Sequence, residues 1–273
     1  MTQQRAQYIP FERGAEPLER AIGRAIEKIG APDFFPAALD CLRSAAPFVG
    51  AFAVKLVALR RPQHLFDNVR AERRSAVIEQ YLDGAYLLDP FYEAYRRLEG
   101  DALLHLSEVA PDRFQQTAYF RQYYREIGLK DEVAVFVRLA DKRYVFLSIG
   151  RRSAETRFLR RDIQALREML PVFASLLRRH YRLLEDGQER AAETEPESPQ
   201  RLEHAMEGFG RAELTAREKE IADLILKGHS SKSIARLFEI SPGTVKLHRK
   251  KIYRKLEVTS QSELFARFLT TLE

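Results

Sequence analysis

Apolar and polar residues follow two different rhythms over the first 184 residues of the chain. Apolar side chains recur every three or four positions over residues 18–29 and 34–46, which predicts two amphipathic helices. The nearly unbroken apolar run over residues 48–59 predicts a buried strand, and residues 64–69 predict a short partner strand that closes a hairpin. Two helices are therefore expected to lead into a sheet.

The next part of the chain combines short helices with a second pair of strands. Helical patterns follow over residues 73–82, 91–97 and 114–127. Gly128 is placed to end the last of them. Two apolar runs, residues 132–139 and 143–149, flank a three-residue connection and predict an antiparallel hairpin. Antiparallel strands covered by helices, without a strand–helix–strand crossover, predict an α+β fold of the GAF or PAS sensor kind rather than a doubly wound sheet.

A long helix is predicted over residues 156–184, with one continuous apolar seam. Four-three spacing joins Leu159, Ile163, Leu166, Leu170, Phe173, Leu177 and Leu184, with His180 in the remaining slot. Pro171 interrupts the seam, because proline removes a backbone donor and kinks a helix. Two interpretations stay open: the seam packs on the unit's own sheet, or it pairs with a second copy of the chain.

The composition changes abruptly between residues 185 and 212. Eight acidic residues oppose three arginines there, so the net charge of this stretch is 3 minus 8, or −5. Residues 191–200 contain two prolines and almost no large apolar side chain, so they cannot offset the entropy of ordering themselves. We therefore expect residues 1–184 to form an α+β sensor domain, residues 185–212 an acidic linker, and residues 213–273 a second domain.

Capping residues mark four short helices between residues 214 and 272. The markers are the capping box Thr215–Glu218, the stop Gly228, the N-cap Ser230, the pair Ser241–Pro242, and a second capping box from Ser260 to Glu263. Glu239 and Ile240 form a tight turn, and small Ala235 lets the next helix cross closely. Two helices joined in this way form a helix-turn-helix unit, whose second helix enters the major groove of DNA.

The third of these helices separates an apolar face from a cationic one. At 100° per residue, Val245, Ile252 and Leu256 lie on one side, facing the predicted core. The opposite side holds Lys246, Leu247, Lys250, Lys251 and Arg254. Six bases and no acid fall between residues 246 and 255, whereas an ordinary solvated face mixes both signs, so we interpret this face as a DNA-binding surface. Leu247 is either a contact to a thymine methyl group or simply an exposed leucine.

Three stretches of this segment resemble the LuxR-type helix-turn-helix family, also called the FixJ/NarL type. They read LTAREKEI from Leu214, GHSSKSIA from Gly228 and TVKLHRKKIYRKL from Thr244. The resemblance implies a four-helix DNA-binding domain in which the base edges are approached by Lys246, Leu247 and Lys250. The phosphate contacts that it implies are Lys232, Thr244 and Arg249. The chain departs from the family pattern at Ser231 and Lys251, where asparagine is usual, and at Glu257, where glycine is common.

Residues 70–184 resemble, more distantly, the autoinducer-binding and GAF-like sensor domains of LuxR-type regulators. The resemblance rests on Tyr81, on residues 86–90 (YLLDP) and on residues 124–129 (YREIGL). In the acyl-homoserine-lactone receptors the matching tyrosine and aspartate bind the lactone amide, which implies Tyr81 and Asp89 as ligand-binding residues. Tryptophans line the pocket of those receptors and this chain has none, so we expect a different effector. Two simpler interpretations stay open: Tyr81 as a core residue and Asp89 as a helix cap.

The sequence contains no residue pattern that supports another functional class. Cys41 is the single cysteine, which excludes an internal disulfide and a multi-thiolate metal site, and its apolar helical context predicts a buried thiol. The histidines show no metal-ligand spacing, and no phosphate-binding glycine loop, serine-nucleophile elbow or phosphoreceiver pattern occurs. We therefore expect no catalytic residue, metal or cofactor. The chain shows neither a secretory signal nor a membrane-spanning apolar run, which predicts a cytoplasmic protein.

These features together predict a cytoplasmic transcriptional regulator that responds to a small molecule. The expected partners are double-stranded DNA, a small-molecule effector, a second copy of the chain, and RNA polymerase. A homodimer follows from the need to read two half-sites about 34 Å apart. The main alternative is control by a protein partner that binds residues 1–184, with no small-molecule pocket. A second alternative makes that unit an enzyme whose output is coupled to DNA binding.

Overall fold

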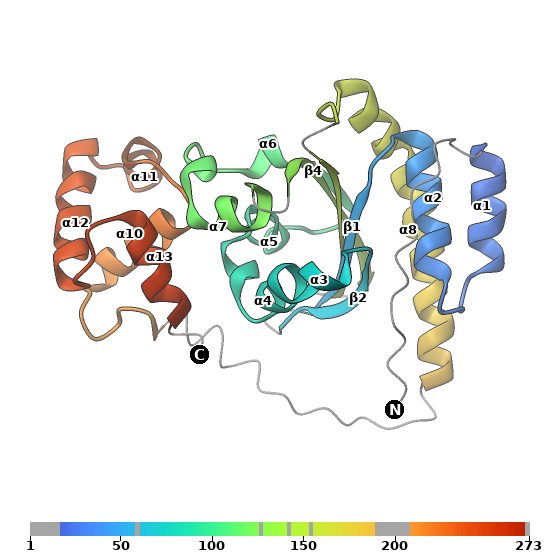
Figure 1. Cartoon of the computed structure of the whole chain (residues 1–273), viewed down its shortest axis with the longest axis horizontal. Helices are drawn as coiled ribbons and strands as arrows, with labels where there is room; N and C mark the ends of the chain where they lie inside the picture. The colour runs from blue at the N-terminus through green and yellow to red at the C-terminus, as the bar shows by residue number, and fades with distance from the viewer. Residues whose placement is uncertain are drawn as a thin grey trace.

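The computed structural model describes residues 17–57, 61–125, 128–140, 143–152, 155–188 and 208–270. Figure 1 shows two units: a sheet with helices on both faces, and a group of helices beside it, drawn in orange and red. The N-terminal unit is α+β and the C-terminal unit is helical, which confirms the predicted fold class. Across the described ranges, no helix is long and apolar enough to cross a bilayer.

The sheet has five strands in the described residues, and all of its neighbours are antiparallel. The strands are β1 (Gly50–Val57), β2 (Gln63–Asp67), β3 (Ala102–His105), β4 (Leu129–Ala140) and β5 (Arg143–Arg152), in the order β2-β1-β5-β4-β3. Both predicted hairpins form, β1 with β2 and β4 with β5. The edge strand β3 was missed, because four residues are too few to show an alternating pattern.

Three helices lie on one side of the sheet, namely α1 (Leu18–Glu27), α2 (Phe34–Ala45) and α8 (Arg160–Gln188). Helix α8 contacts β3 and β4, and α1 packs on α2, farther from the sheet. Their apolar sides and that face of the sheet form one core, in which Leu166, Phe173 and Leu177 of α8 are fully buried. The seam of α8 therefore packs on its own unit, although Leu159 just before the helix is exposed. Cys41 is fully buried in the same core, as predicted.

Short helices cover the opposite face of the sheet. They are α3 (Ala71–Arg74), α4 (Gln80–Leu82), α5 (Pro90–Tyr95), α6 (Leu106–Val109) and α7 (Ala118–Phe120). Short π-helices lie at Ser75–Glu79 and Arg121–Arg125, and short 3-10 helices lie at Ala85–Leu88 and Phe114–Gln116. The single helix predicted over residues 114–127 is wrong, because Thr117 restarts the chain by capping α7 through a hydrogen bond from the Phe120 amide.

The C-terminal unit consists of α10 (Ala216–Leu226), α11 (Ser231–Leu237), α12 (Pro242–Lys255) and α13 (Gln261–Thr270). The predicted N-caps Thr215, Ser230 and Ser241 each accept a backbone hydrogen bond through their side chains. Gly228 ends the first helix with φ at +95°, as its predicted role as a left-handed stop requires. The four predicted helices are therefore present in their predicted order.

Two local features of this unit differ from what residue chemistry favours. Only one of the two hydrogen bonds of the last predicted capping box forms, in which the Ser260 hydroxyl accepts from the Glu263 amide. The Glu263 carboxylate accepts from the amide and hydroxyl of Thr259 instead. Glu239 and Glu257 both have φ at 53°, a left-handed backbone that favours glycine. At Glu257 the helix exit therefore has a left-handed backbone at a residue other than glycine.

The predicted linker, residues 185–212, lies only partly within the described chain. Helix α8 continues through Gln188, beyond its predicted end, and residues 189–207 lie outside the described residues. The C-terminal unit takes in part of the remainder, since Phe209 packs edge-on against Phe268 of α13. The exact domain boundaries stay a prediction.

Candidate effector pocket and DNA-binding surface

A cavity of about 200 Å³ lies between the sheet and the short helices on its second face. The helices contribute Val77, Ile78, Tyr81, Asp89, Tyr119, Tyr123 and Tyr124, and the sheet contributes Phe52, Glu132, Phe146 and Ser148. Gly50 and Gly150, which pair across β1 and β5, bring no side chain to the wall. Most of the wall is aromatic or aliphatic, which is typical of a small-molecule site.

The two ligand-binding candidates from the sequence meet in this cavity. The Tyr81 hydroxyl donates to Asp89 Oδ2 at 2.8 Å, and both side chains line the wall. Asp89 Oδ1 also accepts from the Phe91 amide at 2.8 Å, so Asp89 caps α5 and faces the cavity at once. Burial raises the pKa of the Asp89 carboxyl to about 6, and burial also raises the pKa of Tyr81 well above its usual range.

A second buried carboxyl, Glu132, lines the same cavity. It accepts hydrogen bonds from the hydroxyls of Tyr124 and Ser148. Burial, together with the nearby charge of Asp89, raises the pKa of the Glu132 carboxyl to about 8. Glu132 was missed, although its place directly before the apolar run of residues 133–137 was an available signal.

Three arginines that also line the cavity are exposed to solvent: Arg70, Arg73 and Arg152. They mark the side of the cavity that is open to solvent, and their charge is opposite to that of the buried carboxyls. We call these arginines the basic entrance, and we call Asp89 and Glu132 the acidic inner end. A molecule in the cavity would meet both signs of charge.

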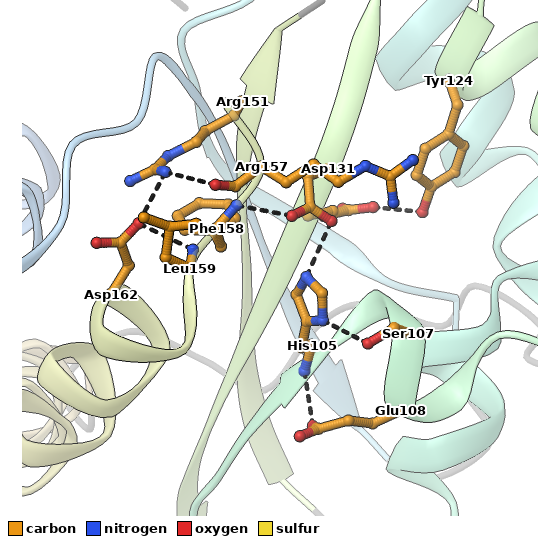
Figure 2. A network of polar contacts seen from close by, with 11 residues as sticks. His105, Ser107, Glu108, Tyr124, Asp131, Arg151, Arg157, Phe158, Leu159 and Asp162 are labelled. Carbon is orange, nitrogen blue, oxygen red and sulfur yellow. Dashed lines mark hydrogen bonds and ion pairs between the residues drawn. The ribbon is translucent and has the colours of Figure 1, made fainter. Parts of the chain in front are cut away.

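A polar network holds β4 in place beside the cavity (Figure 2). Asp131 accepts hydrogen bonds from His105 Nε2 on β3 at 2.9 Å and from the Phe158 amide at 2.8 Å. Burial raises the pKa of the Asp131 carboxyl, but the contact with His105 and the hydrogen bonds from the Phe158 and Glu132 amides together lower it below its usual range. Arg151 on β5 pairs with Asp162 at the start of α8 at 2.8 Å. These contacts join three strands to α8 behind the acidic inner end.

The candidate DNA-binding surface is the outer side of α12. Its exposed residues are Lys246, Leu247, Lys250, Lys251 and Arg254. None of the four basic side chains has a carboxylate at ion-pair distance in the part of the chain that the structure describes. The neighbouring Lys255, by contrast, pairs with Glu218 of α10 at 2.6 Å. Val245 and Ile252 on the other side of α12 are fully buried, so the helix has the two faces that the sequence predicts.

The three predicted phosphate contacts differ in their placement. Lys232 is exposed in the first turn of α11, and Thr244 is exposed in the first turn of α12. Arg249 is half-buried instead: its guanidinium donates to the Tyr253 hydroxyl at 3.0 Å and lies over that ring. The structure therefore groups Thr244 with the exposed face of α12 and turns Arg249 toward Tyr253.

The two units contact each other at the turn between α10 and α11. The Arg113 amide donates to the Gly228 carbonyl at 3.0 Å. The Ser230 amide donates in turn to Asp112 Oδ1 at 2.9 Å. Both contacts fix the backbone that precedes the helix-turn-helix, and the sequence pattern held no signal for them.

Close packing and an ion pair complete this joint. A Cβ added to Gly228 would lie 2.7 Å from the Thr117 methyl group, so only glycine allows the backbones to approach this closely. Lys227 pairs with Glu93 of α5 at 2.6 Å, and α13 contacts α7. Figure 1 shows α7, in green, beside the C-terminal unit. The helix-turn-helix is thus attached to the helices that cover the cavity.

Comparison with known proteins places the chain among bacterial regulators. The family described as "Bacterial regulatory proteins, luxR family" matches residues 212–268. The "Putative HTH-type transcriptional regulator in exeN 3'region" of Aeromonas salmonicida is 30% identical over 186 residues, which cover 67% of this chain and 94% of that protein. The monoamine regulon transcriptional regulator of Klebsiella aerogenes is 25% identical over 189 residues, which cover 69% of this chain and 71% of that protein.

A solved structure resembles the N-terminal unit. The VqsR LBD domain from Pseudomonas aeruginosa superposes with a TM-score of 0.54 at 26% identity, covering 60% of this chain and 96% of that chain. The two relatives above are named as transcriptional regulators, so this chain is a regulator rather than an enzyme. Its cationic helix, its capped helix-turn-helix and these matches together show that the chain belongs to the LuxR family of bacterial regulatory proteins.

Proposed function

We propose that the cavity binds a small-molecule effector and that its occupancy controls DNA binding by α12. The observation that carries this proposal is the position of residues 112–124, which we call the coupling segment. Its first residues contact the C-terminal unit, and its last residues line the cavity. The likeness of the N-terminal unit to an LBD domain supports the sensor role.

Ring contacts connect the two ends of the coupling segment. Tyr119 and Tyr124 line the cavity, and the backbone of Phe114 lies against Gly228. The Phe114 ring meets the Tyr124 ring edge-on, with 5.3 Å between their centroids, and lies 6.0 Å from the Tyr119 ring. A ligand that shifts either tyrosine therefore changes the packing at the joint. In free-energy terms, its effect on DNA binding is limited by the difference between its binding free energies for the two arrangements of the units.

For the C-terminal unit we propose that α12 enters the major groove of double-stranded DNA. The residues assigned to base edges are Lys246, Leu247 and Lys250. The residues assigned to phosphates are Lys232, Thr244, Arg249, Lys251 and Arg254. The support is the exposed basic face of α12, which lacks carboxylate partners over the described residues. Neutralised phosphates release counterions, so operator binding should weaken steeply with salt.

We further propose that the regulator acts as a homodimer. One recognition helix reads only a few base pairs, and two copies on neighbouring half-sites gain affinity from each other. A shallow apolar groove between α1 and α8 supports this assembly, since Ile26 is 54% and Val172 36% exposed there. Contiguous exposed apolar residues commonly mark protein interfaces. RNA polymerase completes the proposed set of partners.

The test loosens the joint without changing the cavity or α12. Asp112→Ala combined with Glu93→Ala removes two of the contacts to the turn between α10 and α11. Operator fragments selected from random-sequence DNA serve as probes, and fluorescence anisotropy at fixed salt measures the affinity of the full chain. We expect the ligand-free affinity to change by about fivefold or more, the usual lower range of allosteric coupling.

The control removes two exposed carboxylates from the same unit by combining Glu72→Ala with Glu79→Ala. This variant should bind the operator as the wild type does. An unchanged affinity in the loosened variant would refute control through the coupling segment. It would then favour the alternative in which a protein partner acts on the N-terminal unit.

A further inference from the structure

We infer that the effector is a compact monoamine whose positively charged nitrogen binds between Asp89 and Glu132. This inference rests on the proposed function, because it takes the cavity as the effector site. The charge, hydrogen-bonding capacity, aromatic walls and size of the cavity indicate the chemical class of the ligand.

Over the described residues, the acidic inner end has no positively charged partner. Asp89 and Glu132 are 4% and 6% exposed, and over the described residues neither carboxyl forms an ion pair. Their hydrogen bonds come from hydroxyl groups and one backbone amide instead. Buried carboxyls are costly to ionise without a cation nearby. A ligand that brings a positive charge removes this cost for both.

When a bound cation ionises both carboxyls, the polar atoms of the inner end offer a ligand acceptors rather than donors. The hydroxyl hydrogens of Tyr81, Tyr124 and Ser148 are already directed at carboxylate oxygens. The remaining capacity is the lone pairs of these hydroxyls and of the two carboxylates. An ammonium group carries three donors and no acceptor, so it matches this set. A carboxylate or phosphate group would find neither charge nor donors there.

The walls favour a cation for a separate reason. Tyr81, Tyr119 and Tyr124 line the cavity on the helical side, and Phe52 and Phe146 line it on the sheet side. Aromatic faces attract cations through the ring quadrupole, and aromatic-walled sites bind organic ammonium groups in this way. The same rings would pack against the apolar body of the ligand.

Size and the charge at the entrance narrow the class. A dry cavity of about 150 Å³ holds benzene. The cavity of about 200 Å³ found here therefore admits a one-ring molecule with a short arm. The basic entrance, with Arg73 and Arg152 among its residues, repels a second positive group, so a diamine is disfavoured.

The test measures binding of three one-ring probes to the full chain: 2-phenylethylamine, 2-phenylethanol and 3-phenylpropionate. Thermal melting screens the probes, and isothermal titration calorimetry gives their affinities. We expect the amine to raise the melting temperature and to bind about tenfold or more tightly than the alcohol or the acid, as a charge-assisted contact does.

Variants then assign the charge. Glu132→Gln should lower amine affinity by about tenfold, because it removes one carboxylate while keeping its shape and its hydrogen-bonding oxygen. Glu79→Gln, an exposed glutamate that does not line the cavity, is the matched control and should bind as the wild type. Asp89→Asn makes the same test at the second carboxyl and preserves the cap of α5, since asparagine is a good N-cap.

The outcomes separate this inference from the proposed function. Binding of the alcohol or the acid without the amine overturns the ligand class and leaves the sensor function standing. Equal amine affinity in the wild type, Glu132→Gln and Asp89→Asn overturns the placement of the nitrogen. Binding of no compound from a panel of amines, neutral molecules and acids overturns both the ligand class and the sensor function.

Discussion

The cavity and the outer face of α12 hold ionisable side chains of opposite kinds, and these side chains differ in burial. On α12, exposed basic residues lack carboxylates over the described chain; at the acidic inner end, Asp89 and Glu132 lack a cation in the same sense. Water solvates the charges on α12, so they stay ionised. Burial shifts the carboxyls of the cavity toward their neutral forms. Salt should therefore control DNA binding by α12, and pH should control the ionisation of the cavity.

The largest expected effect is the pH dependence of stability, which tests the buried carboxyls of the cavity. The pKa of Glu132 is about 8 in the folded protein and lies well above its ordinary value of 4.5. The folded chain therefore binds more protons than the unfolded chain between these values, and stability falls as pH rises through that window. From about pH 5 to 8 we expect a loss on the order of 3 kcal/mol, seen as a fall of several degrees in melting temperature.

Glu132→Gln should flatten that slope, because glutamine carries no titrating proton. Glu79→Gln should keep it, since that glutamate is exposed. A wild-type melting temperature that does not change between about pH 5 and 8 would contradict a raised pKa at the acidic inner end.

The next largest effect concerns the exposed basic face of α12. Lys250→Ala should weaken operator binding by about 1–3 kcal/mol, because it removes a base-edge contact and one positive charge from α12. Competition anisotropy at fixed salt measures the loss. Lys28→Ala, in a pair with Asp33 on the N-terminal unit, is the control and should have no effect. Full operator affinity in Lys250→Ala would show that α12 does not face DNA.

A smaller effect distinguishes base reading from general attraction. Leu247 is 56% exposed among cations, so Leu247→Ala should lower the preference for thymine at one operator position by about 1 kcal/mol. Binding to a set of operators with each base at that position measures the preference. An equal loss on every sequence would leave Leu247 without a role in base choice.

The smallest expected effect concerns the helix exit that supports α12. Glu257→Gly should stabilise the protein by about 0.5–1 kcal/mol, because glycine adopts the left-handed backbone at φ 53° without strain. The control Glu220→Gly, within α10, should destabilise it by about 1 kcal/mol. Chemical denaturation compares both variants with the wild type, and destabilisation by Glu257→Gly would remove strain as the explanation.

The sequence predicted the C-terminal unit better than the cavity, and the reason lies in how far apart the determining residues are. Thr215, Ser230 and Ser241 act on amides three residues away, so a short window of sequence contains the whole signal. Tyr81 and Asp89 were found through a family resemblance. Glu132 and Ser148 were missed, because their shared site exists only after two strands pair.

The joint between the units shows the same limit more strongly. Asp112 and Ser230 are far apart in the sequence, and neither stands in a pattern that predicts their contact. Gly228 was predicted as a helix stop, and the structure adds that its missing side chain lets the two units approach. Local capping chemistry was therefore readable, while the contact that connects the N-terminal and C-terminal units needed the folded chain.

The most direct test of the central claim is the operator affinity of the full chain with and without the probe that binds the cavity most tightly. With the cavity saturated, we expect this affinity to change by about fivefold or more, and we expect Asp112→Ala with Glu93→Ala to abolish the change. The same operator affinity with an empty and a saturated cavity would contradict the claim that the cavity controls α12.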